Sequence, residues 1–281
     1  MQAVFATHST VIVDELNHEN IILARRTFDS RRGFHTEFSQ LEGNFWDKYN
    51  LDEYKHNRFF RYRNSDFFFA KYVIVVESPT DAQVISELLR DVLQEKMFFV
   101  SVLNLDGIKN LKYPYFLLKS LNIPFSMVVD KDFLTQYKND KLSNSRNPIT
   151  QLPEYKNNAN QYNPVINSIW NSETSRCELS SKLKQSYSKL FEYCAAYKLY
   201  PMQYCLEMDL VASTGGRAEY CRVMGVPNND NAYKALLVDR CESIKEPDKT
   251  LQVLGALTPA KYPYSYRKIR NAIAADINSI F

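Results

Sequence analysis

Three short apolar runs, separated by amphipathic segments, dominate the first half of the chain. They cover residues 72–76 (YVIVV), 98–103 (FFVSVL) and 125–129 (FSMVV). Continuous runs of this kind, rich in β-branched residues, are typical of strands buried on both faces of a sheet. Between them, residues 84–92 and 112–121 carry apolar side chains at helical spacing. The alternation of strand and helix predicts βαβ units and a parallel sheet.

The remaining segments have weaker patterns. Residues 2–8 and 21–25 predict short strands, and residues 11–16 predict a helix capped by Ser9 or Thr10. Residues 27–70 are polar and aromatic and predict a helical connector, whereas residues 138–165 are rich in Asn, Lys, Pro and Ser and predict a loop. From residue 166 the pattern is mainly helical, with helices expected over residues 180–197, 231–244 and 266–280. The predicted fold class is therefore α/β, with a mainly helical C-terminal part.

Composition narrows the class of protein. The chain of 281 residues has a net charge of +3 and is 45% hydrophobic, which predicts a globular protein with an ordinary core. The five cysteines form no CxxC pair, so we expect reduced thiols rather than a zinc cluster or a disulfide framework. Neither a membrane span nor a secretion signal is evident, and we expect a cytoplasmic protein that does not enter a membrane.

Acidic residues follow two of the predicted strands directly. Glu77 ends the run 72–76, and Asp130 and Asp132 follow the run 125–129. Because the carboxyl ends of parallel strands lie at one edge of a sheet, these carboxylates are expected to meet there. They repel one another unless a cation neutralises them, and their hard oxygens suit Mg²⁺ or Mn²⁺.

A strand ending in Glu, followed later by a strand ending in Asp-x-Asp, resembles the Toprim pattern. The segment VVESPTDAQVISELL resembles the first motif of the OLD (overcoming lysogenization defect) nucleases, with Asp81 as the second acid and Ser78 where that family usually has Gly. NLDGIKN resembles the turn after the second strand of the family, and LNIPFSMVVDKD resembles its third strand. The resemblance covers residues 70–135 and implies a Toprim domain with a central parallel sheet flanked by helices.

The resemblance also implies a downstream acid on a helix and a late lysine. In CLEMDLV we favour Glu207 as that acid, with Asp209 second, and Lys261 matches the lysine better than Lys268. By this resemblance, the expected catalytic residues are Glu77, Asp130, Asp132 and Lys261, and the expected metal ligands are Glu77, Asp81, Asp130, Asp132, Glu207 and Asp209.

The start of the chain resembles a different module. VFATHSTVIVDEL is similar to the last strand and His switch of ABC-type ATPases, in which His8 would be ATP-related. No GxxxxGK[ST] phosphate loop occurs, so we expect the ATPase portion to be truncated or to lie on another chain. The expected division is an ATPase remnant over residues 1–30, a connector over 31–70 and a Toprim nuclease domain over 71–281, with a helical insertion at about 138–250.

These features together predict a metal-dependent DNA endonuclease of the two-metal type, acting in anti-phage defence under the control of an ATPase portion. DNA and that ATPase portion are the expected partners, and the full assembly is expected to be a homo-oligomer. One alternative is a Toprim protein of the topoisomerase or primase type. Another is a non-catalytic Toprim module that assembles with a partner ATPase. The basic cluster Arg58, Arg61 and Arg63 is interpreted as a solvated face, with DNA phosphate contact as the alternative.

Overall fold

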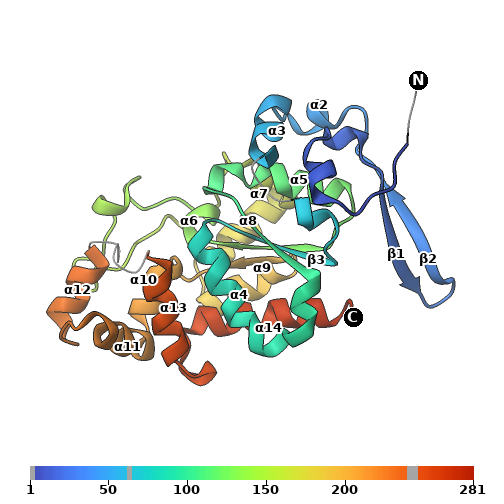
Figure 1. Cartoon of the computed structure of the whole chain (residues 1–281). Helices are drawn as coiled ribbons and strands as arrows, with labels where there is room; N and C mark the ends of the chain where they lie inside the picture. Colours follow the sequence, from blue (N-terminus) through green and yellow to red (C-terminus); the bar gives the residue numbers. More distant parts are fainter. Residues whose placement is uncertain (1–3, 62–64, 239–245) are drawn as a thin grey trace.

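The computed structural model describes residues 4–61, 65–238 and 246–281. Its centre is a four-stranded parallel sheet with the strand order β4-β3-β5-β6 (Figure 1). The strands are β3 (Tyr72–Val76), β4 (Val100–Asn104), β5 (Phe125–Val129) and β6 (Leu199–Pro201). The α/β class and the three predicted strands are confirmed. The fourth strand lies inside the region expected to be a helical insertion.

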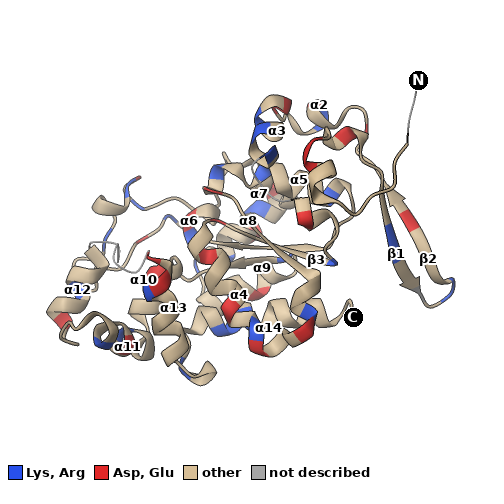
Figure 2. Cartoon of the chain, viewed as in Figure 1, with Lys and Arg blue, Asp and Glu red and all other residues tan. Residues whose placement is uncertain are grey.

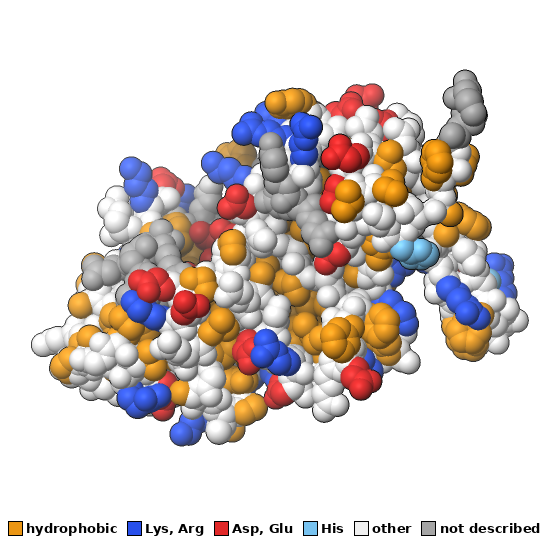
Figure 3. Space-filling model, viewed as in Figure 1, with side chains coloured by type: hydrophobic (Ala, Val, Ile, Leu, Met, Phe, Trp, Pro, Cys, Tyr) orange, Lys and Arg blue, Asp and Glu red, His pale blue; other side chains and the backbone are white. Residues whose placement is uncertain are grey.

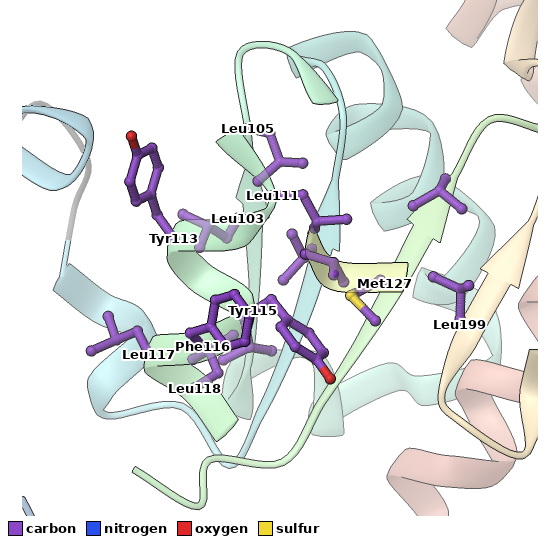
Figure 4. Packing of buried hydrophobic residues seen from close by; sticks show 14 of the residues in the cluster. Leu103, Leu105, Leu111, Tyr113, Tyr115, Phe116, Leu117, Leu118, Met127 and Leu199 are labelled. Carbon is purple, nitrogen blue, oxygen red and sulfur yellow. The ribbon is translucent and has the colours of Figure 1, made fainter. Parts of the chain in front are cut away.

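Alternate residues of each strand point to opposite sides of the sheet, and in β3 both sets are apolar. Helices therefore cover both faces. Val73 and Val75 of β3 belong to the core beneath α5 (Lys112–Ser120), part of which Figure 4 shows. Ile74 and Val76 belong to the second core, which includes the apolar side of α4 (Pro79–Leu93). The strand YVIVV is apolar throughout because it is buried on both sides.

The N-terminal region differs from its prediction. Residues 4–9 form no regular element, and residues 1–3 and Arg63 lie outside the described residues. The segment expected to be a helical connector contains a strand of the antiparallel hairpin β1–β2; Gly33, at φ +71°, directly follows the turn and begins the second strand. The expected boundary between residues 30 and 31 falls in this turn. The elements are α1 (Thr10–Asp14), η1 (His18–Asn20), β1 (Leu23–Asp29), β2 (Gly33–Ser39), α2 (Phe45–Tyr49), α3 (Glu53–Arg61) and η2 (Ser65–Phe68).

Short elements connect the strands of the parallel sheet. They are η3 (Gln94–Phe99), η4 (Ile108–Asn110), α6 (Lys131–Leu134), η5 (Leu142–Asn144) and α7 (Pro164–Ile169). The predicted helix over 180–197 is two helices, because the chain leaves helical geometry at Ser186 with ψ 153°. The helices of the C-terminal part are α8 (Glu173–Leu183), α9 (Tyr187–Ala195), α10 (Leu206–Ala212), α11 (Thr214–Met224), α12 (Asp230–Val238), α13 (Pro247–Ala256), η7 (Pro259–Lys261) and α14 (Tyr264–Asn278).

The last helix ties the sheet together. Asp276 of α14 accepts hydrogen bonds from the Tyr72 hydroxyl at 3.0 Å, from Lys198 Nζ at 2.6 Å and from the Tyr200 hydroxyl. Tyr72 begins β3 and Tyr200 lies in β6, so one carboxylate joins two strands that do not pair with each other. The region after residue 138 is therefore an integral part of the sheet and its cover.

No helix in the described parts of the chain has the length and apolar character needed to cross a membrane.

Two histidines pair inside an aromatic cluster of the N-terminal region. His18 Nδ1 lies 3.0 Å from His56 Nε2, and both side chains are buried. The rings of Phe60, Phe68 and Trp46 pack around them. Burial lowers the pKa of His18 to about 4 and that of His56 to about 2, so the folded state requires neutral imidazoles.

This pair predicts a loss of stability in acid. Above pH 6.5 both imidazoles are neutral in the folded and unfolded states, and the contribution of the pair is fully present. As the pH falls from 7 to 5, the unfolded chain takes up protons that the folded chain excludes, which costs about 2 kcal/mol per histidine. Urea unfolding at both pH values measures the effect. Other buried groups also titrate in this range, so the comparison is with the wild type. His18→Gln and His56→Gln should each shift the change between pH 7 and pH 5 by about 2 kcal/mol toward higher stability in acid, whereas His35→Gln on the hairpin should not. An unchanged dependence in both buried variants would contradict the assignment.

Candidate functional site

Glu77 lies where β3 ends and is fixed by the turn after β4. The Glu77 carbonyl accepts a hydrogen bond from Gly107 N at 3.1 Å, and the Ile108 N–H interacts with its carboxylate. Gly107 adopts φ +113°, a conformation that residues with a Cβ rarely reach. The glycine thus lets two successive backbone N–H groups face the residue that ends the central strand.

Asp81 occupies the first turn of α4, and Figure 2 marks the acidic positions along the ribbon in red. It forms a capping box with Ser78: Ser78 Oγ accepts from Asp81 N at 3.1 Å, and Asp81 Oδ2 accepts from Ser78 N at 2.9 Å and from Ser78 Oγ at 2.8 Å. Ser78 is therefore the N-cap of α4 at the position where the OLD motif usually has Gly. Asp81 caps the N-terminus of α4 through Oδ2, and its charge also acts on Glu77 and Asp130.

Asp130 and Asp132 follow β5, the neighbour of β3. Asp130 is the residue before α6, and Asp132 lies in its first turn. The Tyr137 hydroxyl donates to Asp132 Oδ2 at 3.1 Å and fixes its orientation. β4 and β5 pair with opposite edges of β3, so the order of the strands changes direction between β3 and β5. This position is the topological switch point of the sheet. Ligands of open α/β sheets bind in the crevice at such a point.

Glu207 and Asp209 of α10 have different environments. Glu207 acts electrostatically on Glu77, Asp81 and Asp130, which places it with the acids of the sheet edge. Asp209 is buried and accepts hydrogen bonds from Gln203 N at 2.8 Å and Tyr204 N at 2.9 Å. Each oxygen of Asp209 therefore already accepts a backbone N–H. Of the two expected ligands on this helix, Glu207 has the environment of a ligand, and Asp209 anchors the loop before α10.

The acids raise one another's pKa values. Burial, followed by the charges of Asp132 and Asp81, raises the pKa of Glu77 to about 7. Burial, together with the charge of Glu207, raises the pKa of Asp81 to about 6, against the hydrogen bonds from Ser78. Burial and the surrounding carboxylates raise the pKa of Asp130 well above its usual value. The site is a concentration of negative charge in a poorly solvated edge of the sheet.

The donor set suits a divalent cation. Glu77 Oε2 is buried and has no hydrogen-bond partner, which is costly for a carboxylate oxygen unless a cation contacts it. The surrounding donors are carboxylate oxygens, the ligands that Mg²⁺ and Mn²⁺ prefer. Among the described residues, no three acidic, His or Cys side chains stand in ready-made metal-binding geometry. A cation would therefore have to draw the mutually repelling carboxylates together.

The other expected site residues lie in different surroundings. Lys261 is exposed at the end of η7, where its carbonyl oxygen and Cβ lie close to Gly215 of α11. Lys268, the alternative, donates to Glu192 Oε1 at 3.1 Å. His8 is exposed, and its ring lies 5.9 Å from that of Phe69 between centroids.

Two contributors were not predicted as site residues. Lys131, between the two aspartates, points its Nζ at the ring of Tyr155, 4.9 Å from the centroid, and its charge acts on Asp209. It thereby links α6 to α10, the two helices that carry Asp132 and Glu207. Tyr137 orients Asp132. The triplet Asp-Lys-Asp drew attention to Lys131, but nothing in the sequence distinguished Tyr137 among 19 tyrosines.

The fold and the site together define a protein with acids at the switch point of a parallel sheet. Residues 68–132 match the family model described as "Overcoming lysogenization defect protein-like, TOPRIM domain", which confirms the predicted resemblance for this segment. No curated protein matches the chain.

Solved structures with a similar arrangement include two C-terminal regions of OLD proteins. The region from Xanthomonas campestris pv. campestris is 16% identical, with a TM-score of 0.46, over 76% of this chain and 97% of that one. The region from Burkholderia pseudomallei is 16% identical, with a TM-score of 0.43, over 74% of this chain and 99% of that one.

Charge repulsion in the site predicts an unusual gain in stability on mutation. Asp130→Asn removes one buried charge at nearly constant shape and should raise the free energy of unfolding by about 1–3 kcal/mol in EDTA at pH 8. The carboxylates with raised pKa values cost stability as the pH rises through those values, so the gain should shrink toward pH 5.

Asp209→Asn is the matched control. Although burial raises the pKa of Asp209 to about 7, this change should destabilise the protein, because both carboxylate oxygens accept backbone N–H groups and an amide nitrogen cannot accept one. Saturating Mg²⁺ should raise the melting temperature of the wild type and leave Asp130→Asn almost unchanged, since only the wild type keeps the full set of carboxylates. Thermal melts with and without Mg²⁺ test this, and a less stable Asp130→Asn in EDTA would contradict the electrostatic account.

Proposed function

We propose that this protein is a metal-dependent DNA endonuclease that hydrolyses phosphodiester bonds. The observation that carries the proposal is the group of carboxylates at the switch point, Glu77, Asp81, Asp130, Asp132 and Glu207, with Glu77 Oε2 buried and unpartnered. Apart from the capping box of Asp81, gathering these charges costs stability, so we attribute the arrangement to binding of Mg²⁺ or Mn²⁺ and a phosphate. The Toprim match over residues 68–132 supports this choice of chemistry.

Bound divalent metal supplies a water of lowered pKa and polarises the phosphate. The chain would hold the metal with Glu77 and Asp130 from two neighbouring strands and with Asp132 and Glu207 from two helices. The hydrogen bonds of Tyr137 to Asp132 and of Ser78 to Asp81 limit the rotation of these carboxylates. Lys261 is our candidate for the cation that stabilises the growing charge on the phosphate.

The wider setting of the enzyme is part of the same proposal. The likeness of residues 4–16 to the end of an ABC-type ATPase domain, with His8 in the His-switch position, supports regulation by an ATPase portion. We accordingly propose an ATPase remnant, a connector and a nuclease domain in that order, a homo-oligomeric assembly on DNA, a role in anti-phage defence and a cytoplasmic location.

Cleavage of supercoiled plasmid in Mg²⁺ or Mn²⁺ tests the activity, both with the chain alone and with an ATPase portion supplied. Glu77→Gln and Asp130→Asn should each lower the cleavage rate about a hundredfold or more, because each removes a metal ligand. Glu95→Gln in η3, at the amino edge of the sheet, is the control and should cleave like the wild type. Equal, intact plasmid with the wild type and both variants would refute the nuclease. A covalent protein–DNA adduct would point to a topoisomerase instead.

The role of Lys261 is tested separately. Lys261→Ala should lower the cleavage rate about tenfold to a hundredfold without changing the Mg²⁺ concentration needed for half-maximal rate, since the lysine contacts phosphate and not metal. Lys268→Ala, which loses an ion pair with Glu192, should cleave normally. If Lys268→Ala lowers the rate and Lys261→Ala does not, the assignment passes to Lys268.

A further inference from the structure

A second, smaller site adjoins the acidic one. A cavity of about 250 Å³ lies between residues 108–112 and residues 160–165. Lys109 and Lys112 line one wall, and Asn160 and Tyr162 line the other. Leu111 and Val165, both buried, also line it.

Each wall is attached to a segment that carries an acid of the candidate site. On one wall, the N–H groups of Gly107 and Ile108 donate hydrogen bonds to the carbonyl and the carboxylate of Glu77. On the other wall, Asn160 N donates to Leu134 O at 2.9 Å, and Leu134 ends α6, which holds Asp132. The cavity is therefore built into the same edge of the sheet as the carboxylates, on the side covered by α5.

The charge of the lining has the opposite sign to that of the carboxylates. Lys109 is exposed, Lys112 is half-buried, and no carboxylate is among the residues that line the cavity. In the space-filling view, Lys and Arg side chains gather over α3, with acidic side chains both beside and beneath them (Figure 3). The lysines of this neighbouring cavity would attract a polyanion that the metal-binding acids alone would repel.

The aromatic side chain at the rim has no structural role in the core. Tyr162 is 87% exposed, whereas tyrosine is in general intermediate in burial. The neighbouring Asn163 is engaged, because its Oδ1 accepts from Val165 N at 2.9 Å and from Ile166 N at 3.3 Å at the start of α7. Tyr162 is thus held on a capped, ordered segment with its ring free to stack.

We propose that this cavity, the lysine–tyrosine pocket of Lys109, Lys112 and Tyr162, binds the nucleic-acid strand next to the phosphate that is cleaved. The two lysines contact backbone phosphates, and the Tyr162 ring stacks on an unpaired base. Stacking requires a base outside a duplex, so the pocket favours single-stranded or locally opened DNA. This inference rests on the proposed function and specifies which form of DNA the site takes.

Binding without cleavage tests the pocket. We would measure the fluorescence anisotropy of a labelled single-stranded oligonucleotide, and of its duplex, with Ca²⁺ in place of Mg²⁺ over a range of salt concentrations. The double variant Lys109→Gln/Lys112→Gln should bind the single strand about tenfold more weakly. The slope of log K against log salt should fall by about 1.4 for two lost phosphate contacts. Tyr162→Ala should weaken binding about fivefold or more with an unchanged slope.

Lys96→Gln is the matched control, because Lys96 lies in η3 at the amino edge of the sheet and donates to Asn278. It should bind like the wild type. The pocket is refuted if the lysine variant and Tyr162→Ala both keep wild-type affinity and salt slope, or if the control loses as much affinity as the double variant.

The plasmid assay separates the two ideas. If the wild type cleaves plasmid and the pocket variants bind normally, the pocket hypothesis is refuted and the nuclease hypothesis stands. If the pocket variants lose binding but no metal-dependent cleavage occurs, the pocket stands as a strand-binding site and the nuclease hypothesis is refuted.

Discussion

Mutual repulsion among carboxylates at one edge of the sheet is the constraint on which the rest of the structure depends. Glu77 and Asp130 end neighbouring parallel strands, and the charges of Asp81, Asp132 and Glu207 add to theirs. A fold that gathers these groups in a poorly solvated place needs rigid support from every element that carries one. The capping box of α4, the Gly107 turn and the anchoring of α10 through Asp209 are that support.

The support reaches across the whole chain. Asp209 accepts from the backbone of Gln203 and Tyr204 directly after β6, and Lys131 acts on it from the start of α6. On the side of the sheet where β3 begins, Asp276 of α14 accepts hydrogen bonds from Tyr72 of β3 and Tyr200 of β6. Acids that are far apart in sequence are therefore held by elements from residue 72 to residue 278. The expected insertion at about 138–250 thus contributes β6 to the sheet.

The part of the fold that could be predicted is the part with a strong local pattern. The strand 72–76 is apolar throughout and is followed by Glu77, and the strand 125–129 is followed by Asp130, so both the sheet and its acidic edge were evident. Strand β6 was missed because three residues between helices carry no periodicity. The hairpin β1–β2 was partly missed because Phe28, Phe34 and Phe38 are exposed rather than buried, so their spacing does not mark a core face. Glu207 and Asp209 have the same local pattern; the structure separates them by the backbone contacts of Asp209 and by the charge of Glu207 acting on the other acids.

The hydrogen bonds of Asp276 have a consequence for synthesis. Glu207 follows β6, and β6 is joined to the central strand by a residue of the final helix. During translation, the acids from Glu77 to Asp132 leave the ribosome long before that helix, and domains fold as their segments emerge. A nascent chain consequently carries all five carboxylates before it has the helix whose Asp276 joins β3 to β6. If the site cleaves DNA, the order of these elements delays that activity until α14 has been made.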